Sequence, residues 1–461
     1  MRPAELALLA MVLVGTVRPV TRAARAPAVA VLVAVVTLLV AAGHVFAEGA
    51  RWQLTSLYLA GVVVVLAAAG DVARTPDPRS GRGGWALVGL LAILGGTLGW
   101  ALPIPTLPAP SGPRPVGTSV VELVDEQRLD RYGPNPTAPR RLVLQVWYPA
   151  DIDAPVRPGP LIPAGASFGR HAASWLGFPP FTLDHVGLVR SHATADVPPT
   201  PEAGALQVVV YAHGWGGFRT IQSDLAESLA SHGYVVAALD HTHGSVATSF
   251  PDGRVVPIDE SALPDGVASD VYDAASERLV ETFTQDLAFL LDELAEGAVP
   301  ALTGRLDLDA VGVVGHSTGG GAAVRLCAED RRCAAVVGFD PWVEPVPDVV
   351  VGDGLTVPFL ALRSEEWVGN DNDARLRRLR ASSTGPAALV SVAGTAHRDV
   401  TLLPFMSPLA ARLGLAGPTD GARTHDIAET WTRGWLDHHL RGAVRDPLVQ
   451  PPEFDESIVD G

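Results

Sequence analysis

The stretch Val311-Gly312-Val313-Val314-Gly315-His316-Ser317-Thr318-Gly319-Gly320 determines the fold of this chain. Its apolar beginning, Val311 to Val314, has the composition of a buried strand, and the alanine-rich segment after the glycines is typical of a helix. Glycines on both sides of Ser317 permit a strained turn and a close approach of helix to strand, where a side chain would clash. The stretch therefore predicts a strand, a sharp turn with Ser317 at its tip, and a helix.

This turn has the G-x-S-x-G pattern of the nucleophile elbow in the α/β-hydrolase fold, a mostly parallel sheet flanked by helices. Alone, the pattern is weak evidence in a chain with 47 glycines. Two later strands strengthen it, because the apolar run Ala334 to Phe339 ends in Asp340 and the run Ala388 to Val392 leads to His397. Ser, Asp and His follow in the order that this fold uses, each after the carboxyl end of a strand. We therefore predict Ser317 as nucleophile, Asp340 as acid and His397 as base.

Each of these assignments has a competitor. Ser317 could be an ordinary turn serine, and Asp340 could simply begin the turn that Pro341 continues. Some hydrolases of this fold carry the acid one strand later, where Glu365, Glu366 and Asp371 follow the run Val357 to Leu362. The other histidines considered as the base are His213, His241, His243, His316, His425, His438 and His439. The last three lie in an amphipathic C-terminal segment, where solvated histidines are the usual case.

A fourth element of the site lies upstream, where the strand Gln207 to Tyr211 leads into Ala212-His213-Gly214-Trp215-Gly216-Gly217-Phe218. This stretch is similar to the HG-type loop that donates backbone N–H groups to the oxyanion of an acyl-transfer transition state. We predict the amides of Trp215 and Thr318 as the two donors. The alternative is an ordinary glycine-rich loop between a strand and the helix Ile221 to His232.

Aromatic residues accompany these elements. Trp342 and Phe218 are candidates for the wall of an apolar substrate pocket, together with Trp215. Aromatic residues beside a sheet belong equally often to the core, so both interpretations stay open.

Several stretches together resemble one family. They are His213 to Thr220, Leu229 to His241, the turn at Ser317, Phe339-Asp340-Pro341-Trp342, and Gly394 to Arg398. From about Leu142 to about Phe405 the chain resembles the secreted-type platelet-activating factor acetylhydrolases. The resemblance implies a serine-dependent lipase or esterase that needs no metal ion or cofactor and removes short or oxidised acyl chains from glycerophospholipids at a membrane surface. Bacterial polyester hydrolases and dienelactone hydrolases share parts of the pattern, the latter usually with cysteine at the position of Ser317.

The resemblance also places a lipid-facing lid at the proline-rich insertion Asp151 to Ala205. This insertion contains Trp175-Leu176, Phe178 and Phe181, an apolar group with which an interfacial lipase could reach acyl chains. An ordinary packed loop explains these residues equally well.

The N-terminal third of the chain has a different composition. A helix that spans a membrane needs about 20 apolar residues, and the chain begins with apolar runs that have almost no charges and no polar face. They are Leu6 to Val17, Pro27 to Phe46, Leu54 to Gly70 and Trp85 to Leu102. The first run is short and carries Glu5 at its edge, so we predict four spans, with three as the alternative. Surface helices of a globular protein would show a polar face.

Charges between the apolar runs predict the orientation. Arg18, Arg22 and Arg25 lie in the first connection and Arg74, Arg79 and Arg82 in the third, whereas the second has Arg51 beside Glu48. Arginine-rich connections remain in the cytoplasm, so everything after Leu102 is predicted to be extracytoplasmic. Six prolines between residues 103 and 115 predict a polyproline-type spacer. The predicted division is a transmembrane region at 1–102, a linker at 103–117 and a hydrolase domain at 118–461, in a multi-pass cell-membrane protein.

Composition excludes some functions. The first 110 residues hold eight arginines and four acidic residues, so they have a net positive charge. The rest of the chain is therefore more negative than the formal charge of −16 of the whole chain. Such an acidic domain does not bind nucleic acid. The two cysteines, Cys327 and Cys333, could form a disulfide outside the cytoplasm or remain two buried thiols. Their spacing with the histidines is not that of a metal site, so we predict no metal or cofactor.

Three functions compete at this point. The leading one is a membrane-tethered serine esterase that acts on lipid esters. The second is a general carboxylesterase or polyester hydrolase without lipid preference, which the sequence does not separate from the first. The third is a membrane sensor or binding protein with a non-catalytic hydrolase-like domain. Intact Ser317, Asp340 and His397 argue against the third, and the apolar runs lack the central ionisable residue that is usual in a transport path.

Overall fold

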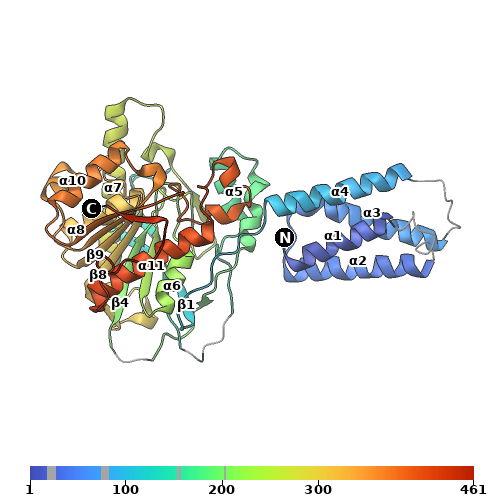
Figure 1. The fold of residues 1–461 in the computed structure, drawn as a ribbon, viewed down its shortest axis with the longest axis horizontal. Helices are drawn as coiled ribbons and strands as arrows, with labels where there is room; N and C mark the ends of the chain where they lie inside the picture. Colours follow the sequence, from blue (N-terminus) through green and yellow to red (C-terminus); the bar gives the residue numbers. More distant parts are fainter. Residues whose placement is uncertain (18–26, 74–81, 152, 154–156, 202–203, 461) are drawn as a thin grey trace.

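The structure is a computed structural model that describes residues 1–17, 27–73, 82–151, 153, 157–201 and 204–460. In this described part, four N-terminal helices form an elongated bundle, and the rest forms a sheet with helices on both faces (Figure 1). The bundle meets the larger part at one end only, so the two lie end to end along the long axis of the molecule.

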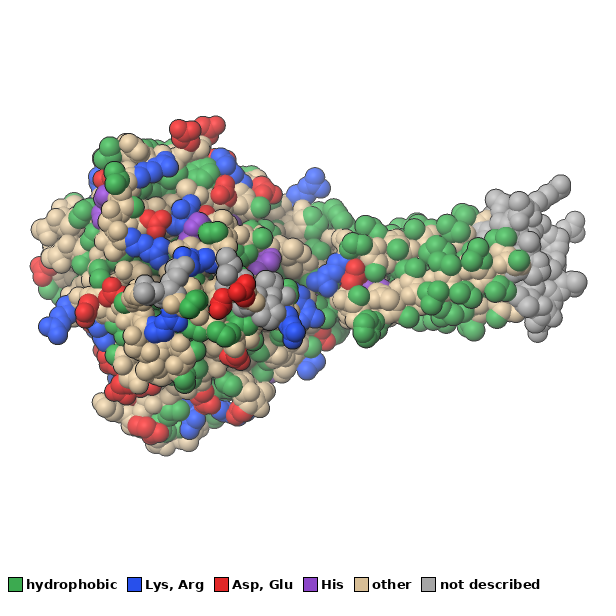
Figure 2. All heavy atoms as spheres, turned by 90° about the horizontal axis from the view of Figure 1, so that it is seen from below, with side chains coloured by type: hydrophobic (Ala, Val, Ile, Leu, Met, Phe, Trp, Pro, Cys, Tyr) green, Lys and Arg blue, Asp and Glu red, His purple; other side chains and the backbone are tan. Residues whose placement is uncertain are grey.

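The bundle helices carry apolar side chains around their circumference. They are α1 (Pro3–Val17), α2 (Pro27–Ala47), α3 (Thr55–Ala73) and α4 (Arg82–Ala101). Leu39 and Leu66 are 67% and 65% exposed, and Figure 2 shows hydrophobic side chains over the visible face of the bundle. Helices that expose apolar residues on every side are suited to hydrocarbon rather than to water.

Among the described helices, three are long and apolar enough to cross a membrane, over Ala28–Ala47, Trp52–Gly70 and Gly84–Ala101. Helix α1 has 15 residues, fewer than the roughly 20 that a hydrocarbon core requires, so a fourth span stays a prediction. Most of the arginines that predict the orientation lie outside the described residues. These are Arg18, Arg22, Arg25, Arg74 and Arg79.

A buried ion pair joins the helices at the end of the bundle that meets the insertion. The Arg51 guanidinium donates to both carboxylate oxygens of Glu5, at 2.6 and 2.8 Å. It also donates to the carbonyl oxygen of Leu102, just after α4, at 2.6 Å. Glu5, which the sequence places at the edge of an apolar run, is therefore buried and paired rather than solvated.

His44 and Glu48 extend this polar group. Together with Glu5 they offer ligand atoms that lie close enough to hold one metal ion. However, the two ring nitrogens of His44 already contact Glu48 and Tyr58, at 3.0 and 2.8 Å, and Glu5 is paired with Arg51. The ligand atoms of Glu5, His44 and Glu48 are thus already engaged in ion pairs and hydrogen bonds.

The described residues form a ten-stranded sheet in the order β12-β11-β10-β9-β8-β4-β5-β2-β1-β3. The strands are β1 (Val116–Leu129), β2 (Pro139–Pro149), β3 (Thr194–Ala195), β4 (Leu206–Ala212), β5 (Val235–Asp240), β8 (Leu306–His316), β9 (Cys333–Phe339), β10 (Phe359–Ser364), β11 (Ala387–Val392) and β12 (Ser457–Val459). From β5 to β11 all neighbours are parallel, whereas β2 and β12 pair antiparallel at the two sides. The predicted mostly parallel sheet is confirmed. A separate hairpin contains β6 (Ala247–Ser249) and β7 (Val255–Pro257).

Helices cover the two faces of the sheet. One face carries α6 (Ser223–Ser231) and α11 (Gly421–Arg441), and the other carries α7 (Ser269–Glu296), α8 (Thr318–Glu329), α9 (Asp348–Asp353) and α10 (Asp371–Ser382). Strand β4 alternates between them, because Val208 and Val210 pack in the core with α7 and α8 while Val209 and Tyr211 pack with α6 and α11. Burial on both faces explains why the central strands are continuous apolar runs.

The segment predicted as a polyproline-type spacer is partly packed. Ile104 and Leu107 are buried in a cluster with Phe168 and Val186 of the insertion, and β1 already begins at Val116. The physical reason is that apolar side chains between the prolines fill a hydrophobic cluster instead of facing water.

The insertion contains α5 (Ala166–Trp175) and η4 (Pro180–Leu188). Its base is packed, but Leu176, Phe178 and Phe181 stay about half exposed. Trp175 lies against the loop after β4, since a Cβ atom on Gly216 would be 2.4 Å from the Trp175 ring. The insertion therefore has both a packed side and an exposed apolar side.

We predict that Leu287→Ala destabilises the full chain, because Leu287 is fully buried between α7 and the sheet. The free energy of unfolding should fall by about 2–5 kcal/mol. Leu413→Ala removes the same atoms from a side chain that is 64% exposed and should change it by less than about 0.5 kcal/mol. Thermal unfolding of the detergent-solubilised variants measures the difference, and equal midpoints would contradict this placement of the core.

Candidate active site

Ser317 occupies the strained turn between β8 and α8. Its backbone has a φ of 52° and a ψ of −119°, a region that non-glycine residues rarely adopt. Its N–H donates to Phe339 at 3.0 Å, and its carbonyl oxygen accepts from Gly321 and Trp342 at 3.0 and 2.9 Å. Backbone hydrogen bonds with β9, α8 and the loop after β9 thus hold this turn.

Glycines permit the packing around this turn. A Cβ atom on Gly315 would lie 2.3 Å from the carbonyl oxygen of Gly319, and one on Gly319 would lie 2.3 Å from that of Ala212. Helix α8 can therefore approach β8 and β4 only because both positions are glycine.

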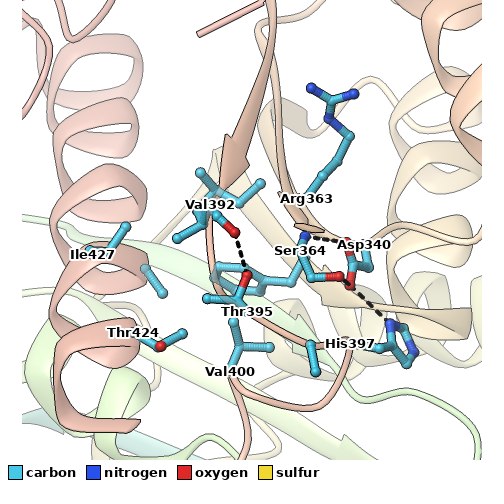
Figure 3. A pocket seen from close by; sticks show the side chains of 13 residues that line it. Asp340, Arg363, Ser364, Val392, Thr395, His397, Val400, Thr424 and Ile427 are labelled. Carbon is cyan, nitrogen blue, oxygen red and sulfur yellow. Dashed lines mark hydrogen bonds and ion pairs between the residues drawn. The ribbon is translucent and has the colours of Figure 1, made fainter. Parts of the chain in front are cut away.

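Asp340 directly follows β9 and points toward the loop that carries His397 (Figure 3). The Asp340 residue is 3% exposed. Ser364 donates to it twice, through its N–H at 2.7 Å and its hydroxyl at 2.6 Å. The Nδ1 atom of His397 lies 3.0 Å from Oδ2 of Asp340. The structure thus brings the predicted acid and base together, and adds Ser364, which sequence reasoning missed.

The alternative acids have other contacts. Glu365 accepts a hydrogen bond from the backbone N–H of Gly394, and Glu366 accepts one from the backbone N–H of His397. Asp371 is exposed in the first turn of α10. Of the four candidate carboxylates, only Asp340 contacts the imidazole ring in the described residues.

Two more rings surround the His397 side chain. The Trp367 indole stacks on the imidazole with centroids 4.3 Å apart and planes 7° apart. The His316 ring lies 4.7 Å away, and its Nε2 donates to the carbonyl oxygen of His397 at 2.9 Å. Among the described residues, the Ser317 hydroxyl and His397 do not form a hydrogen bond with each other. Such contacts are often long before substrate binds.

Burial controls the electrostatics of this group. It lowers the pKa of the His397 imidazole to about 4 and that of His316 to about 3. It raises the pKa of the Asp340 carboxyl to about 7, against the two donors from Ser364, which favour the carboxylate. Because Asp340 and His397 share a hydrogen bond, they titrate as a pair. As the pH falls, the pair takes up a first proton. Nε2 of His397 is then no longer free to accept a proton.

The loop after β4 lies against the Ser317 turn. The N–H of Trp215 donates to the Thr318 hydroxyl at 3.3 Å, a long bond that a better acceptor can replace. Thr318 is the first residue of helix α8, so its backbone N–H has no acceptor within the helix. The two amides predicted as donors therefore belong to segments that contact each other.

A buried polar network supports this loop. Nε2 of His213 accepts from the N–H of His241 at 3.2 Å and from the Ser245 hydroxyl at 2.8 Å. The His241 ring in turn contacts Asp286 at 3.0 Å, and Asp286 makes two hydrogen bonds to Arg140, at 2.7 and 2.6 Å. His213 and His241, two of the alternative bases, are therefore bonded to each other and to Asp286 within this network, and Asp286 and Arg140 are partners that sequence reasoning missed.

The pocket candidates lie apart from the cavity beside Asp340 and His397. That cavity is lined mainly by apolar side chains of the neighbouring strands, the loop after β11 and α11 (Figure 3). Phe218 is buried against Phe168 of the insertion, with ring centroids 4.8 Å apart. Trp342 is half-buried, and its indole N–H donates to Glu344 at 3.0 Å. Neither ring lines this cavity.

The structure also places the two cysteines and His425. Cys327 at the end of α8 and Cys333 at the start of β9 are joined by a disulfide, with Cα atoms 5.1 Å apart. The expectation that His425 is solvated is wrong, because it is buried in α11. Its ring nitrogens contact Asp224 and the carbonyl oxygen of Thr401, partners distant in sequence.

The parallel sheet with a serine at a strained turn between strand and helix has the architecture of the α/β-hydrolase class. The family described as platelet-activating factor acetylhydrolase, isoform II, matches residues 106–255 and 290–444. The chain belongs to this family, which confirms the resemblance predicted from its motifs.

Individual relatives agree with this assignment. The platelet-activating factor acetylhydrolase of Bos taurus is 26% identical over 283 residues, which cover 55% of this chain and 60% of the bovine protein. The probable 1-alkyl-2-acetylglycerophosphocholine esterase of Arthroderma benhamiae is 25% identical over 267 residues, 55% of this chain and 64% of that protein. The chain thus matches less than two thirds of the length of these relatives. A solved ferulic acid esterase structure from Streptomyces cinnamoneus has a TM-score of 0.63 and 28% identity, over 77% of this chain and 99% of that chain.

We predict that Gly319→Ala disrupts the packing of α8, because its Cβ atom would overlap the Ala212 carbonyl oxygen. The free energy of unfolding should fall by about 1–3 kcal/mol, and hydrogen exchange in residues 212–222 should accelerate. Gly159→Ala is the control, since a Cβ atom there meets nothing within 4 Å. The packing argument fails if both variants exchange and unfold like the unaltered chain.

Proposed function

We propose that this protein is a membrane-anchored serine esterase that hydrolyses short or oxidised acyl esters of glycerophospholipids. The observation that carries the proposal is the 3.0 Å contact between Asp340 and the ring of His397. The carbonyl oxygen of His397 also accepts a hydrogen bond from His316, the residue before the strained Ser317. Family membership supports an ester substrate, because the bovine relative is named a platelet-activating factor acetylhydrolase and the fungal one an alkyl-acetylglycerophosphocholine esterase.

Ser317 is the nucleophile in this proposal. His397 removes the hydroxyl proton through Nε2 while the Ser317 oxygen forms a bond to the acyl carbon. The tetrahedral intermediate then expels the alcohol of the lipid, and His397 returns the proton to that oxygen. Water, deprotonated by His397, then attacks the acyl carbon of the acyl-serine. The bond to the Ser317 oxygen breaks, the carboxylic acid leaves, and His397 returns the proton to the Ser317 oxygen. Asp340 holds the Nδ1–H of His397 and stabilises the imidazolium at each step.

The oxyanion of each intermediate would be bound by the N–H groups of Trp215 and Thr318. A preorganised donor of this kind contributes about 3 kcal/mol to transition-state stabilisation. The bond from Trp215 to the Thr318 hydroxyl would be exchanged for one to the oxyanion, which is a stronger acceptor because it carries the charge.

Residues 1–102 are proposed as the membrane anchor, 103–117 as a packed connection and 118–461 as an extracytoplasmic hydrolase domain. The long apolar helices α2, α3 and α4 support anchoring. The disulfide between Cys327 and Cys333 supports an oxidising compartment outside the cytoplasm.

A general carboxylesterase is the second candidate. It is favoured by the likeness to the Streptomyces ferulic acid esterase, which extends over 99% of that chain. The two candidates differ in whether a phospholipid acyl ester is cleaved better than a small soluble ester.

Ser317→Ala should abolish activity, because it removes the nucleophile. Hydrolysis of short-acyl phosphatidylcholine, long-acyl phosphatidylcholine and p-nitrophenyl acetate by the full-length protein in detergent provides the measurement, with a rate loss of at least about 10³-fold expected. Ser269→Ala, an exposed serine at the start of α7, is the control and should keep full activity.

The substrate panel separates the candidates. Cleavage of the short-acyl phospholipid that is lost in Ser317→Ala supports the phospholipid esterase. Cleavage of the nitrophenyl ester alone favours the general carboxylesterase. If no substrate is cleaved in a Ser317-dependent manner, a non-catalytic binding protein becomes the better hypothesis.

We predict that kcat/KM falls as the pH falls through about 7, where the Asp340 and His397 pair takes up its first proton. Ser364→Ala removes a hydroxyl donor that favours the carboxylate, so the pKa of the pair should rise and the acidic limb should move to higher pH. The pH dependence of kcat/KM on p-nitrophenyl acetate tests this sign. A limb that moves to lower pH would show that Ser364 does not stabilise the carboxylate.

A further inference from the structure

Three consecutive residues of η7 (Glu365–Trp367) contact the loop that carries His397. Glu365 accepts from the N–H of Gly394 at 2.5 Å, and Glu366 accepts from the N–H of His397 at 2.7 Å. Trp367 stacks on the His397 ring at 4.3 Å with nearly parallel planes. The backbone N–H of Glu366 also donates to Thr395 at 3.4 Å.

We propose that η7 is a clamp that positions His397, with Glu366 and Trp367 as positioning residues. This inference rests on the proposed role of His397 as the general base. It assigns a function to Glu366, which competes with Asp340 as the acid in the sequence, and to a tryptophan that the sequence did not single out.

The geometry explains why such a clamp is needed. The residues after Val392 are not in a helix or strand, so the peptide plane of His397 is not fixed by a backbone ladder. The hydrogen bond to Glu366 fixes the backbone N–H of His397. The contact with Asp340 and the stacked Trp367 indole restrict rotation of the His397 ring. A general base loses rate steeply when its nitrogen moves by about 1 Å from the proton it abstracts.

The aromatic face has a second consequence. His397 becomes an imidazolium when it takes the proton from Ser317, and a cation over an indole face is stabilised by the ring quadrupole. The parallel stacking of the two rings, with centroids 4.3 Å apart, therefore favours the charged state that forms during the reaction more than the neutral resting state. This is a contribution that appears in kcat.

The charge of Glu366 acts on the same pair. The charged and titratable groups around the His397 ring are Asp340 after β9, His316 at the end of β8, Glu366 in η7 and Arg398 on its own loop. The negative charge of Glu366 raises the pKa of both His397 and Asp340, whereas Arg398 lowers that of His397. Burial keeps His316 uncharged near neutral pH. Removing the Glu366 charge must therefore lower the pH at which the pair takes up its first proton.

The first experiment compares Glu366→Gln with Glu366→Ala in the full-length protein, with p-nitrophenyl acetate as substrate. Glutamine keeps a carbonyl acceptor for the His397 N–H but removes the charge. The acidic limb of kcat/KM should then move to lower pH, while the plateau kcat stays within about twofold. Alanine also removes the acceptor, so the plateau kcat should fall about tenfold with little change in KM. Glu329→Gln, an exposed glutamate at the end of α8, removes the same charge elsewhere and should leave the pH profile unchanged.

The second experiment compares Trp367→Phe with Trp367→Leu. Phenylalanine keeps an aromatic face and should retain most of kcat, whereas leucine should lower kcat about tenfold. A role limited to packing would lower the thermal unfolding midpoint of Trp367→Leu but leave the kcat of the folded variant unchanged.

The outcomes separate this inference from the proposed function. If Ser317→Ala is inactive but Glu366→Gln, Glu366→Ala and Trp367→Leu all keep the unaltered pH profile and kcat, the clamp is wrong and the esterase stands. If Ser317→Ala keeps its activity, the proposed function itself fails. A shifted limb in Glu366→Gln together with a low kcat in Trp367→Leu supports the clamp.

Discussion

The positive φ at Ser317 is the constraint on which the rest of the site depends. A non-glycine residue in this region costs of order 1 kcal/mol or more and persists only where the surroundings enforce it. Here the enforcement is a set of backbone hydrogen bonds, one donated by Ser317 to Phe339 and two accepted by Ser317 from Gly321 and Trp342. Glycines also let α8 approach two strands. Strands β8 and β9 and helix α8 therefore form one unit around the serine, and Asp340 is fixed at the same place because it follows β9.

Buried charges around this unit are paired, which explains why they are tolerated. Asp340 accepts from Ser364 and contacts His397. On the other side of the serine turn, Asp286 neutralises Arg140 and orients His241, which in turn holds His213 below the loop of Trp215. An unpaired charge at either position would cost several kcal/mol, so these pairs keep both loops in place before substrate arrives.

Sequence patterns predict those features that follow from strands. Asp340 and the His397 loop come after β9 and β11, which both neighbour β10, so a parallel sheet must bring them to one edge. Side chains whose partners depend on turn geometry could not be predicted. Glu366 follows a strand just as Asp340 does, yet the short η7 turn directs its carboxylate to a backbone N–H. His425 lies on an amphipathic helix, but its partner Asp224 is 201 residues earlier, beyond the reach of any periodicity.

The contacts at the end of the bundle link the proposed anchor to the loops of the site. Arg51 binds the carbonyl oxygen of Leu102, and the neighbouring Trp52 donates its indole N–H to Thr182 of η4 at 3.1 Å and packs edge-on against Phe181. Helix α5 of the same insertion places Trp175 over Gly216. If the bundle is anchored as proposed, the exposed apolar side of the insertion is held at the end of the membrane helices.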